Sequence, residues 1–250
     1  LLALQEGSKI LMFESGHSTT IWSKGFALLL MVHLLGDIHQ PLHAVTLYNE
    51  KFKPPHGDVG GNLWTIHYRV LKQRFTQLHL LFDCMGGDLC GYLPNPVTSE
   101  FAQNITIWAD ELENEFPKTL FTDDELYPNI TSSTRFFDIV NQWAYESYEL
   151  ARVAYDQYPL NTSITTTSIE WAHNVLRKRV ALAGYRMAHV LSKVDTTQNS
   201  VPENINHEIQ IWRITAIVAG IFAVVVFIIA IMACIYNYKA QPDDVSLASV

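Results

Sequence analysis

HLLGDIHQPLH, residues 33–43, is the stretch from which the rest of the sequence can be interpreted. On a helix, His33 and Asp37 lie one turn apart on the same face, so an imidazole and a carboxylate can converge on one ion. Pro41 ends regular helix near this point and lets His43 turn toward a second position. The stretch therefore predicts a helix that ends in a group of potential metal ligands.

The same His-x-x-x-Asp spacing returns between His79 and Asp83. Imidazole nitrogen and carboxylate oxygen suit Zn²⁺, and catalytic zinc sites keep one coordination position open for water. A single pair at this spacing is commonly a surface ion pair worth roughly 0.3 kcal/mol. Both pairs, however, lie in segments rich in Leu and Phe, where ionisable groups are costly unless they are paired or metal-bound. Together the two pairs favour a metal site.

Three motifs in order carry a resemblance to a known family. They are HLLGDIHQPLH, GDVGGN at Gly57 to Asn62 and QLHLLFD at Gln77 to Asp83, with weaker matches in WAYESYELA from Trp143 and AGYRMAHVL from Ala183. Over about residues 30–191 the sequence resembles the class I nucleases. These comprise fungal and plant single-strand-specific nucleases and membrane-anchored protozoan 3′-nucleotidase/nucleases; the bacterial zinc-dependent phospholipases C are relatives by fold.

The resemblance implies an all-α, mainly helical phospholipase C/nuclease-like domain with a small β-hairpin and a trinuclear zinc cluster at the base of a cleft. By their places in the motifs, His33 would bind one zinc ion and Asp37 would bridge that ion and another. The remaining zinc ion would be held by His43, His79 and Asp83. The resemblance thus implies one complete three-ligand site and half of another.

Two further motif residues have less direct parts in the implied site. Asn62 matches the Asn of the family's GGN motif and would contact the substrate phosphate or the reacting centre, so it joins Asp37 as a candidate catalytic residue. His39 matches a position that binds no zinc; it would either support the ligands or be an ordinary packed histidine. The family's amino-terminal Trp and its upstream His and Asp ligands have no counterpart, so we expect the sequence to begin within a longer protein.

The activity that the resemblance implies is that of a zinc-dependent endonuclease and 3′-nucleotidase. Its substrates would be single-stranded DNA or RNA and 3′-nucleotides, its nucleophile a metal-activated hydroxide, and no protein partner is expected. Two alternatives remain open. The same cluster could hydrolyse phospholipid, as in the phospholipases C, or the domain could be a helical ectodomain that has lost its metal centre and serves in binding.

Composition constrains these functions. The chain has 250 residues, of which 48% are hydrophobic, and a formal net charge of −8. Such an apolar chain can bury a core, which excludes an intrinsically disordered protein. The negative charge argues against nucleic-acid binding through a basic surface. An enzyme that acts on phosphates would then need a local positive charge, for which metal ions are the usual source.

Residues 214–236 contain no charged side chain. As a helix they would be about 34 Å long, enough to cross a hydrocarbon core of ~30 Å. A buried core helix is the alternative, but such helices seldom run so far without a polar face. We therefore expect a single-pass membrane protein, with domain 1–194 extracellular or luminal, a linker at 195–213 and a cytosolic tail at 237–250.

Sequons and cysteines support this orientation. Asn104, Asn129 and Asn161 each begin an Asn-x-Ser/Thr glycosylation sequon, and all three precede the apolar segment. Cys84 and Cys90 flank a Gly-rich loop and suit a local disulfide in an oxidising compartment, worth on the order of 2 kcal/mol. Two reduced thiols are the alternative.

Periodicity predicts the helices of the domain. They extend over Trp22 to Leu35, over Phe101 to Phe116 before Pro117, over Phe136 to Ala151, and onward from Thr167, where Thr167 and Glu170 form a capping box. We interpret their apolar stripes as core rather than as a cofactor site. Leu63 to Val70 predicts one strand of a hairpin, after a long loop from Ala44 to Gly61.

Overall fold

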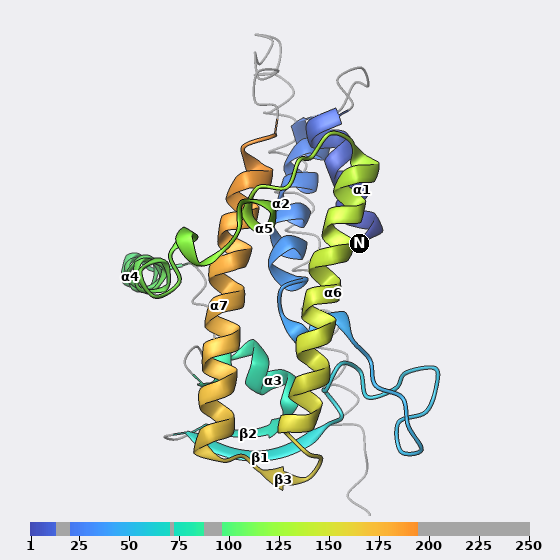
Figure 1. Ribbon diagram of the computed structural model, residues 1–250, viewed down its shortest axis with the longest axis vertical. Coiled ribbons are helices and arrows are strands. Elements are labelled where there is room, and N and C mark those ends of the chain that lie inside the picture. Colours follow the sequence, from blue (N-terminus) through green and yellow to red (C-terminus); the bar gives the residue numbers. More distant parts are fainter. Residues whose placement is uncertain (14–20, 71–72, 88–96, 195–250) are drawn as a thin grey trace, which may run out of the picture. The chain divides into compact units, whose positions relative to one another are not determined.

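The computed structural model describes residues 1–13, 21–70, 73–87 and 97–194 (Figure 1). Its α-helices are α1 (Leu2–Ser8), α2 (Ile21–Asp37), α3 (Leu78–Asp83), α4 (Ser99–Glu115), α5 (Asp123–Leu126), α6 (Ser133–Gln157) and α7 (Thr166–Leu191). Shorter helical turns are η1 (Lys9–Phe13), η2 (Pro41–Ala44), η3 (Met85–Gly87) and η4 (Lys118–Leu120). The strands are β1 (Thr65–Val70), β2 (Gln73–Gln77) and β3 (Thr162–Ser163). The prediction of a mainly helical domain is confirmed.

Helices α1, α2, α6 and α7 share one hydrophobic cluster. Helix α1 packs against both α2 and α6, and α7 packs against α2. The apolar stripe predicted between Phe136 and Ala151 is buried over its whole length, because every third or fourth residue of α6 points to this side. Its partners in the core include Leu4, Met31, Leu35 and Val190.

Helix α3 follows directly from a strand of a small β-sheet. Strands β1 and β2 pair antiparallel, from Thr65 opposite Gln77 to Val70 opposite Gln73, so the predicted hairpin is confirmed. The strand begins at Thr65 rather than at Leu63. The third strand, β3, pairs parallel with β1, giving the order β2-β1-β3. Because α3 follows β2 without a connecting loop, the buried hairpin determines where α3 lies.

The stripe predicted on α4 is only partly buried. Leu112 and Phe116 are buried in a cluster with Leu126 and Leu182. Ile105, in contrast, is 39% exposed, and Phe101 is only half-buried. An apolar stripe is buried only where a partner covers it, and the cluster with α7 lies at the carboxyl end of α4.

The capping box predicted at Thr167 is wrong. Helix α7 begins two residues earlier than the cap implies, and its N-cap is Thr165, whose side chain accepts a hydrogen bond from the backbone N–H of Ser168 (3.1 Å). Thr165 follows the β3 segment in an extended conformation (φ −88°, ψ 161°), as an N-cap requires. In a run of three threonines, the position of β3 therefore determines which one caps the helix.

Substitutions of Thr165 and Thr167 should distinguish the observed N-cap from the predicted one. Thr165→Ala should lower the free energy of unfolding by about 1 kcal/mol, because the N–H of Ser168 loses its acceptor. Thr167→Ala, in the first turn of the helix and exposed, should change it by less than about 0.5 kcal/mol. Urea denaturation followed by circular dichroism measures both. An equal loss in the two variants would contradict the assignment of the cap.

Several predictions concern residues outside the described ones. They include Cys90, the linker 195–213, the apolar segment 214–236 and the tail 237–250. Across the described ranges, no helix is both long enough and apolar enough to cross a membrane. The disulfide and the membrane span stay predictions. So does glycosylation, although Asn104, Asn129 and Asn161 are all exposed.

Candidate metal centre

The turn that follows α2 determines the position of His43. Regular helix ends at Asp37, four residues before Pro41, as predicted: a proline has no N–H to donate to the carbonyl four residues earlier, and its ring clashes with that carbonyl. The chain turns through residues 38–40, and the side chain of Gln40 then caps η2 by accepting from the backbone N–H of Leu42. Pro41 occupies the first position of η2, where a missing N–H costs little. This turn brings His43 back toward Asp37, with 3.5 Å between His43 Nδ1 and Asp37 Oδ1.

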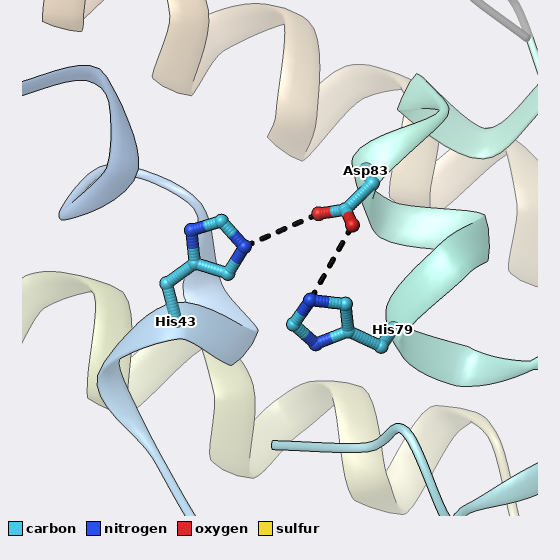
Figure 2. Close-up of side chains that lie close together, drawn as sticks. All are labelled: His43, His79 and Asp83. Carbon is cyan, nitrogen blue, oxygen red and sulfur yellow. Dashed lines mark ion pairs between the residues drawn. The ribbon is translucent and has the colours of Figure 1, made fainter. Parts of the chain in front are cut away.

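Helix α3 supplies the other half of the site. Its residues His79 and Asp83 lie one turn apart, with 3.3 Å between His79 Nε2 and Asp83 Oδ2. The other oxygen of Asp83 lies 3.3 Å from His43 Nε2. Figure 2 shows both rings turned toward the Asp83 carboxylate. One ligand atom from each of the three residues falls within a mutual distance of 4.8 Å, which is the arrangement of a three-ligand metal site.

The tautomer of His79 fits a bound cation. Its Nδ1 lies 2.7 Å from the carbonyl oxygen of Gly60, which can only accept, so Nδ1 carries the proton. In the neutral imidazole the lone pair is then on Nε2, the atom that faces Asp83. A lone pair and a carboxylate at this distance need a proton or a metal ion between them. A metal-ligating histidine commonly has this hydrogen bond to a backbone carbonyl.

The charges within the site reinforce one another. A hydrogen bond with Asp83 raises the pKa of His43 above its ordinary value; partial burial opposes this, and the nearby charges of Asp83 and Asp37 add to it. Burial acts to raise the pKa of Asp83, but hydrogen bonds from His43 and Gln40 outweigh it and lower that pKa. The amide of Gln40 donates to Asp83 Oδ1 at 2.8 Å. The carboxylate is therefore ionised at neutral pH and oriented for a ligand.

The five predicted ligands form one continuous group. His33 Nε2 lies 3.3 Å from Asp37 Oδ2, and the other oxygen of Asp37 faces His43. The His33–Asp37 pair offers two donor groups, and the side chain of His33 is 68% exposed. The structure thus brings together a three-ligand site and a more exposed two-ligand site, with the carboxylate of Asp37 between them.

The GDVGGN loop lies against this group through Gly60 rather than through Asn62. Asn62 is half-buried, and its side-chain amide donates to the carbonyl of Val59 (3.0 Å), not to a predicted ligand. Gly60 instead presents its carbonyl to His79. The role of Asn62 toward a substrate stays a prediction.

Sequence reasoning missed the residues that support this loop. Asp58 is fully buried and accepts from the N–H groups of Leu47 (2.8 Å) and Gly61 (2.9 Å). It also accepts from the hydroxyl of Tyr155, 97 residues further along the chain. Burial and this hydrogen bond raise the pKa of Tyr155, so its hydroxyl stays protonated. Asp58 lies within the motif and could have been noticed, but nothing near Tyr155 in sequence points to it.

His39 contacts none of the predicted ligands. It is 2% exposed, and its ring nitrogens lie against the carbonyl of Leu35 and the guanidinium of Arg186. Burial and the charges of Arg179 and Arg186 lower its pKa well below the ordinary value. The ring of His39 thus binds a backbone carbonyl and an arginine rather than the side chain of a predicted ligand, and its support of the ligands stays a prediction.

Comparison with known proteins identifies the family of this chain. The family model for the S1/P1 nucleases matches residues 3–195. Endonuclease 1 of Arabidopsis thaliana is 24% identical over 198 residues, which cover 78% of this chain and 57% of that protein. Endonuclease 4 of the same plant is 26% identical over 187 residues, 74% of this chain and 56% of that protein. The chain thus spans slightly more than half the length of these relatives. With most of its length matched by the family model, the chain belongs to the S1/P1 nuclease family.

Proposed function

We propose that this chain is a metal-dependent nuclease domain that hydrolyses phosphodiester bonds in single-stranded nucleic acid and also accepts 3′-nucleotides. The observation that carries the proposal is the convergence of His43, His79 and Asp83, with the lone pair of His79 Nε2 facing a carboxylate. Membership in a nuclease family supports the reaction class. Zinc suits two imidazoles and one carboxylate with a position left open.

Asp37 supports a second metal position. Its two oxygens face different partners, His33 at 3.3 Å and His43 at 3.5 Å, as expected of a carboxylate that bridges two ions. His33 and Asp37 would then supply part of a second and a third site.

The protein's own groups orient the site for phosphate. Gly60 fixes the ring of His79, and Gln40 fixes the carboxylate of Asp83, so neither ligand has to reorient when it binds. Zinc held there supplies Lewis-acid chemistry: it neutralises phosphate charge and lowers the pKa of a water molecule toward ~7. That charge matters in a chain whose formal net charge is −8, because the surface as a whole repels a polyanion.

Metal removal tests the proposal directly. The full chain is treated with a chelator and assayed on a single-stranded oligonucleotide, on the corresponding duplex and on a 3′-nucleotide. We expect at least about a hundredfold loss of hydrolysis, since the metal provides the main electrostatic stabilisation, and recovery on adding Zn²⁺. Phospholipid vesicles, assayed for released diacylglycerol, serve as the comparison substrate. Full activity after chelation would contradict the proposal, and release of diacylglycerol without nucleotide would favour a phospholipase.

A further inference from the structure

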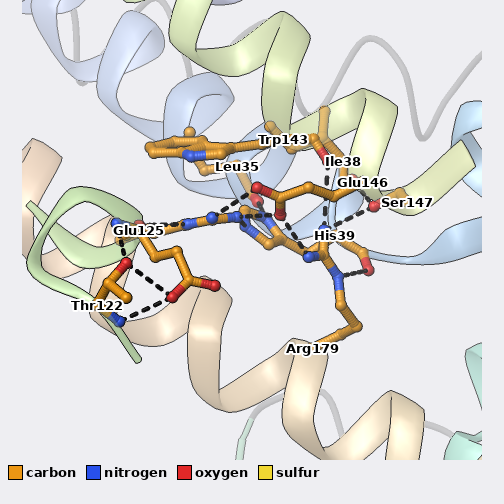
Figure 3. Close-up of polar contacts among 10 residues, drawn as sticks. Leu35, Ile38, His39, Thr122, Glu125, Trp143, Glu146, Ser147 and Arg179 are labelled. Carbon is orange, nitrogen blue, oxygen red and sulfur yellow. Dashed lines mark hydrogen bonds and ion pairs between the residues drawn. The ribbon is translucent and has the colours of Figure 1, made fainter. Parts of the chain in front are cut away.

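A buried ionic cluster joins α6 to α7 (Figure 3). The carboxylate of Glu146 accepts from Arg179 Nη1 at 2.7 Å. It also accepts from both terminal nitrogens of Arg186, at 2.7 and 2.9 Å. The side chains of Arg186 and Arg179 are only 1% and 7% exposed, so their charges are removed from water, whereas the side chain of Glu146 is 29% exposed. Two buried guanidinium groups thus share one partly exposed carboxylate.

The cluster also reaches the turn that connects Asp37 to His43. Arg179 donates through Nε to the backbone carbonyl of His39 (3.1 Å). Ser147 donates to the neighbouring carbonyl of Ile38 and itself accepts from Arg179 Nη2 at 2.8 Å. Carbonyls at the end of a helix have no partner within the helix, and here the ones next to Asp37 are held by α6 and α7.

The side chain of His39, which lies in the same turn, also binds the cluster. Arg186 Nη1 can only donate, so His39 Nε2 (3.1 Å away) accepts, and His39 Nδ1 donates to the carbonyl of Leu35 (2.7 Å). The ring is therefore neutral and has a single possible tautomer. Both the backbone and the side chain of His39 are thus held in one orientation.

Stability alone is a poor reason for this arrangement. Burying charges costs solvation energy, and well-packed apolar residues commonly replace a buried ionic cluster without loss of stability. What the cluster provides that apolar residues cannot is directional hydrogen bonding to chosen backbone atoms. Those atoms belong to the turn between two predicted metal ligands.

We infer that Glu146, Ser147 and Arg179 are positioning residues of the metal centre. They hold the turn at residues 38–40, so that Asp37 at the end of α2 and His43 on η2 stay at their mutual distance of 3.5 Å. A site of this kind depends on ligand placement to within about 0.5 Å. The inference rests on the proposed metal centre and adds the residues that set its geometry.

Two variants of the full chain and one control test this. Arg179→Lys keeps the charge but loses the planar group that reaches both His39 and Glu146. Ser147→Ala removes only one hydroxyl. The control is Arg177→Lys, on the same helix, whose guanidinium pairs with Glu115 on α4. The readouts are Zn²⁺ affinity in competition with a chromophoric chelator, the visible spectrum of the Co²⁺-loaded protein, and thermal unfolding of the metal-free protein.

We expect Zn²⁺ to bind about tenfold more weakly to Arg179→Lys and about threefold more weakly to Ser147→Ala, as for other residues that orient metal ligands. The Co²⁺ spectrum should change in both variants, and the control should match the wild type. Wild-type affinity and an unaltered Co²⁺ spectrum in Ser147→Ala would overturn the inference, even if Arg179→Lys did not fold. If the wild-type chain bound no Zn²⁺, the proposed metal centre itself would be wrong.

Discussion

Replacing Asp83 by Asn should lower kcat/KM on a single-stranded oligonucleotide by about a thousandfold and remove zinc from the His43–His79–Asp83 site. The carboxylate faces both histidines at 3.3 Å and supplies the only formal negative charge of these three groups. An amide keeps the shape but has no charge to offset that of a divalent cation. The measurements are steady-state hydrolysis and zinc content of the purified protein.

Asp156→Asn is the matched control for this variant. Asp156 is an exposed carboxylate on α6, so the substitution removes the same charge outside the metal centre. Both zinc content and hydrolysis should stay at the wild-type level. If Asp83→Asn retained wild-type activity with a full complement of zinc, the assignment of Asp83 as a ligand would be refuted.

Gly60→Ala should lower the free energy of unfolding by about 3 kcal/mol. Gly60 has a φ of +59°, which costs a residue with a side chain ~1–2 kcal/mol. An added Cβ would also lie 2.6 Å from the carbonyl oxygen of Leu42 and 3.2 Å from that of Val45, and neither backbone atom can move easily. Urea denaturation measures the loss.

The same substitution should also weaken zinc binding by on the order of tenfold. The carbonyl of Gly60 orients His79, so a backbone displacement at residue 60 moves the acceptor of the His79 Nδ1 proton. Gly184→Ala is the control, because its Cβ would meet no heavy atom within 4 Å and Gly184 lies inside α7. There the change should stabilise the protein by ~0.5–1 kcal/mol. A Gly60→Ala variant that is as stable as Gly184→Ala would show that the loop tolerates a side chain.

Local patterns predicted much of the fold. The stripe on α6 and the alternation in β1 were interpreted correctly because both depend on the repeat of one element, which the sequence shows directly. The burial of the apolar stripe on α4 and the N-cap residue of α7 were predicted less well. Burial of Ile105 needs a covering partner, and the choice of Thr165 depends on where β3 ends, so neither is a local property.

In the candidate site, too, some contacts follow from spacing along the chain and others depend on the tertiary structure. The spacings His33–Asp37 and His79–Asp83 are one helical turn, so each pair converges as soon as its helix forms. No spacing relates Gln40 to Asp83, which lie 43 residues apart and meet only because the hairpin places α3 beside η2.

The sequence by itself determined the family motifs, the main helices and the residue types of the proposed metal site, because each of these follows from order and spacing along the chain. Only the tertiary structure decided what holds the ligands in place. Tyr155 reaches Asp58 across 97 residues, and Arg179 reaches the carbonyl of His39 across 140. Hydrogen bonds of this kind depend on where helices lie in space, and a backbone carbonyl has no identity that a sequence could reveal.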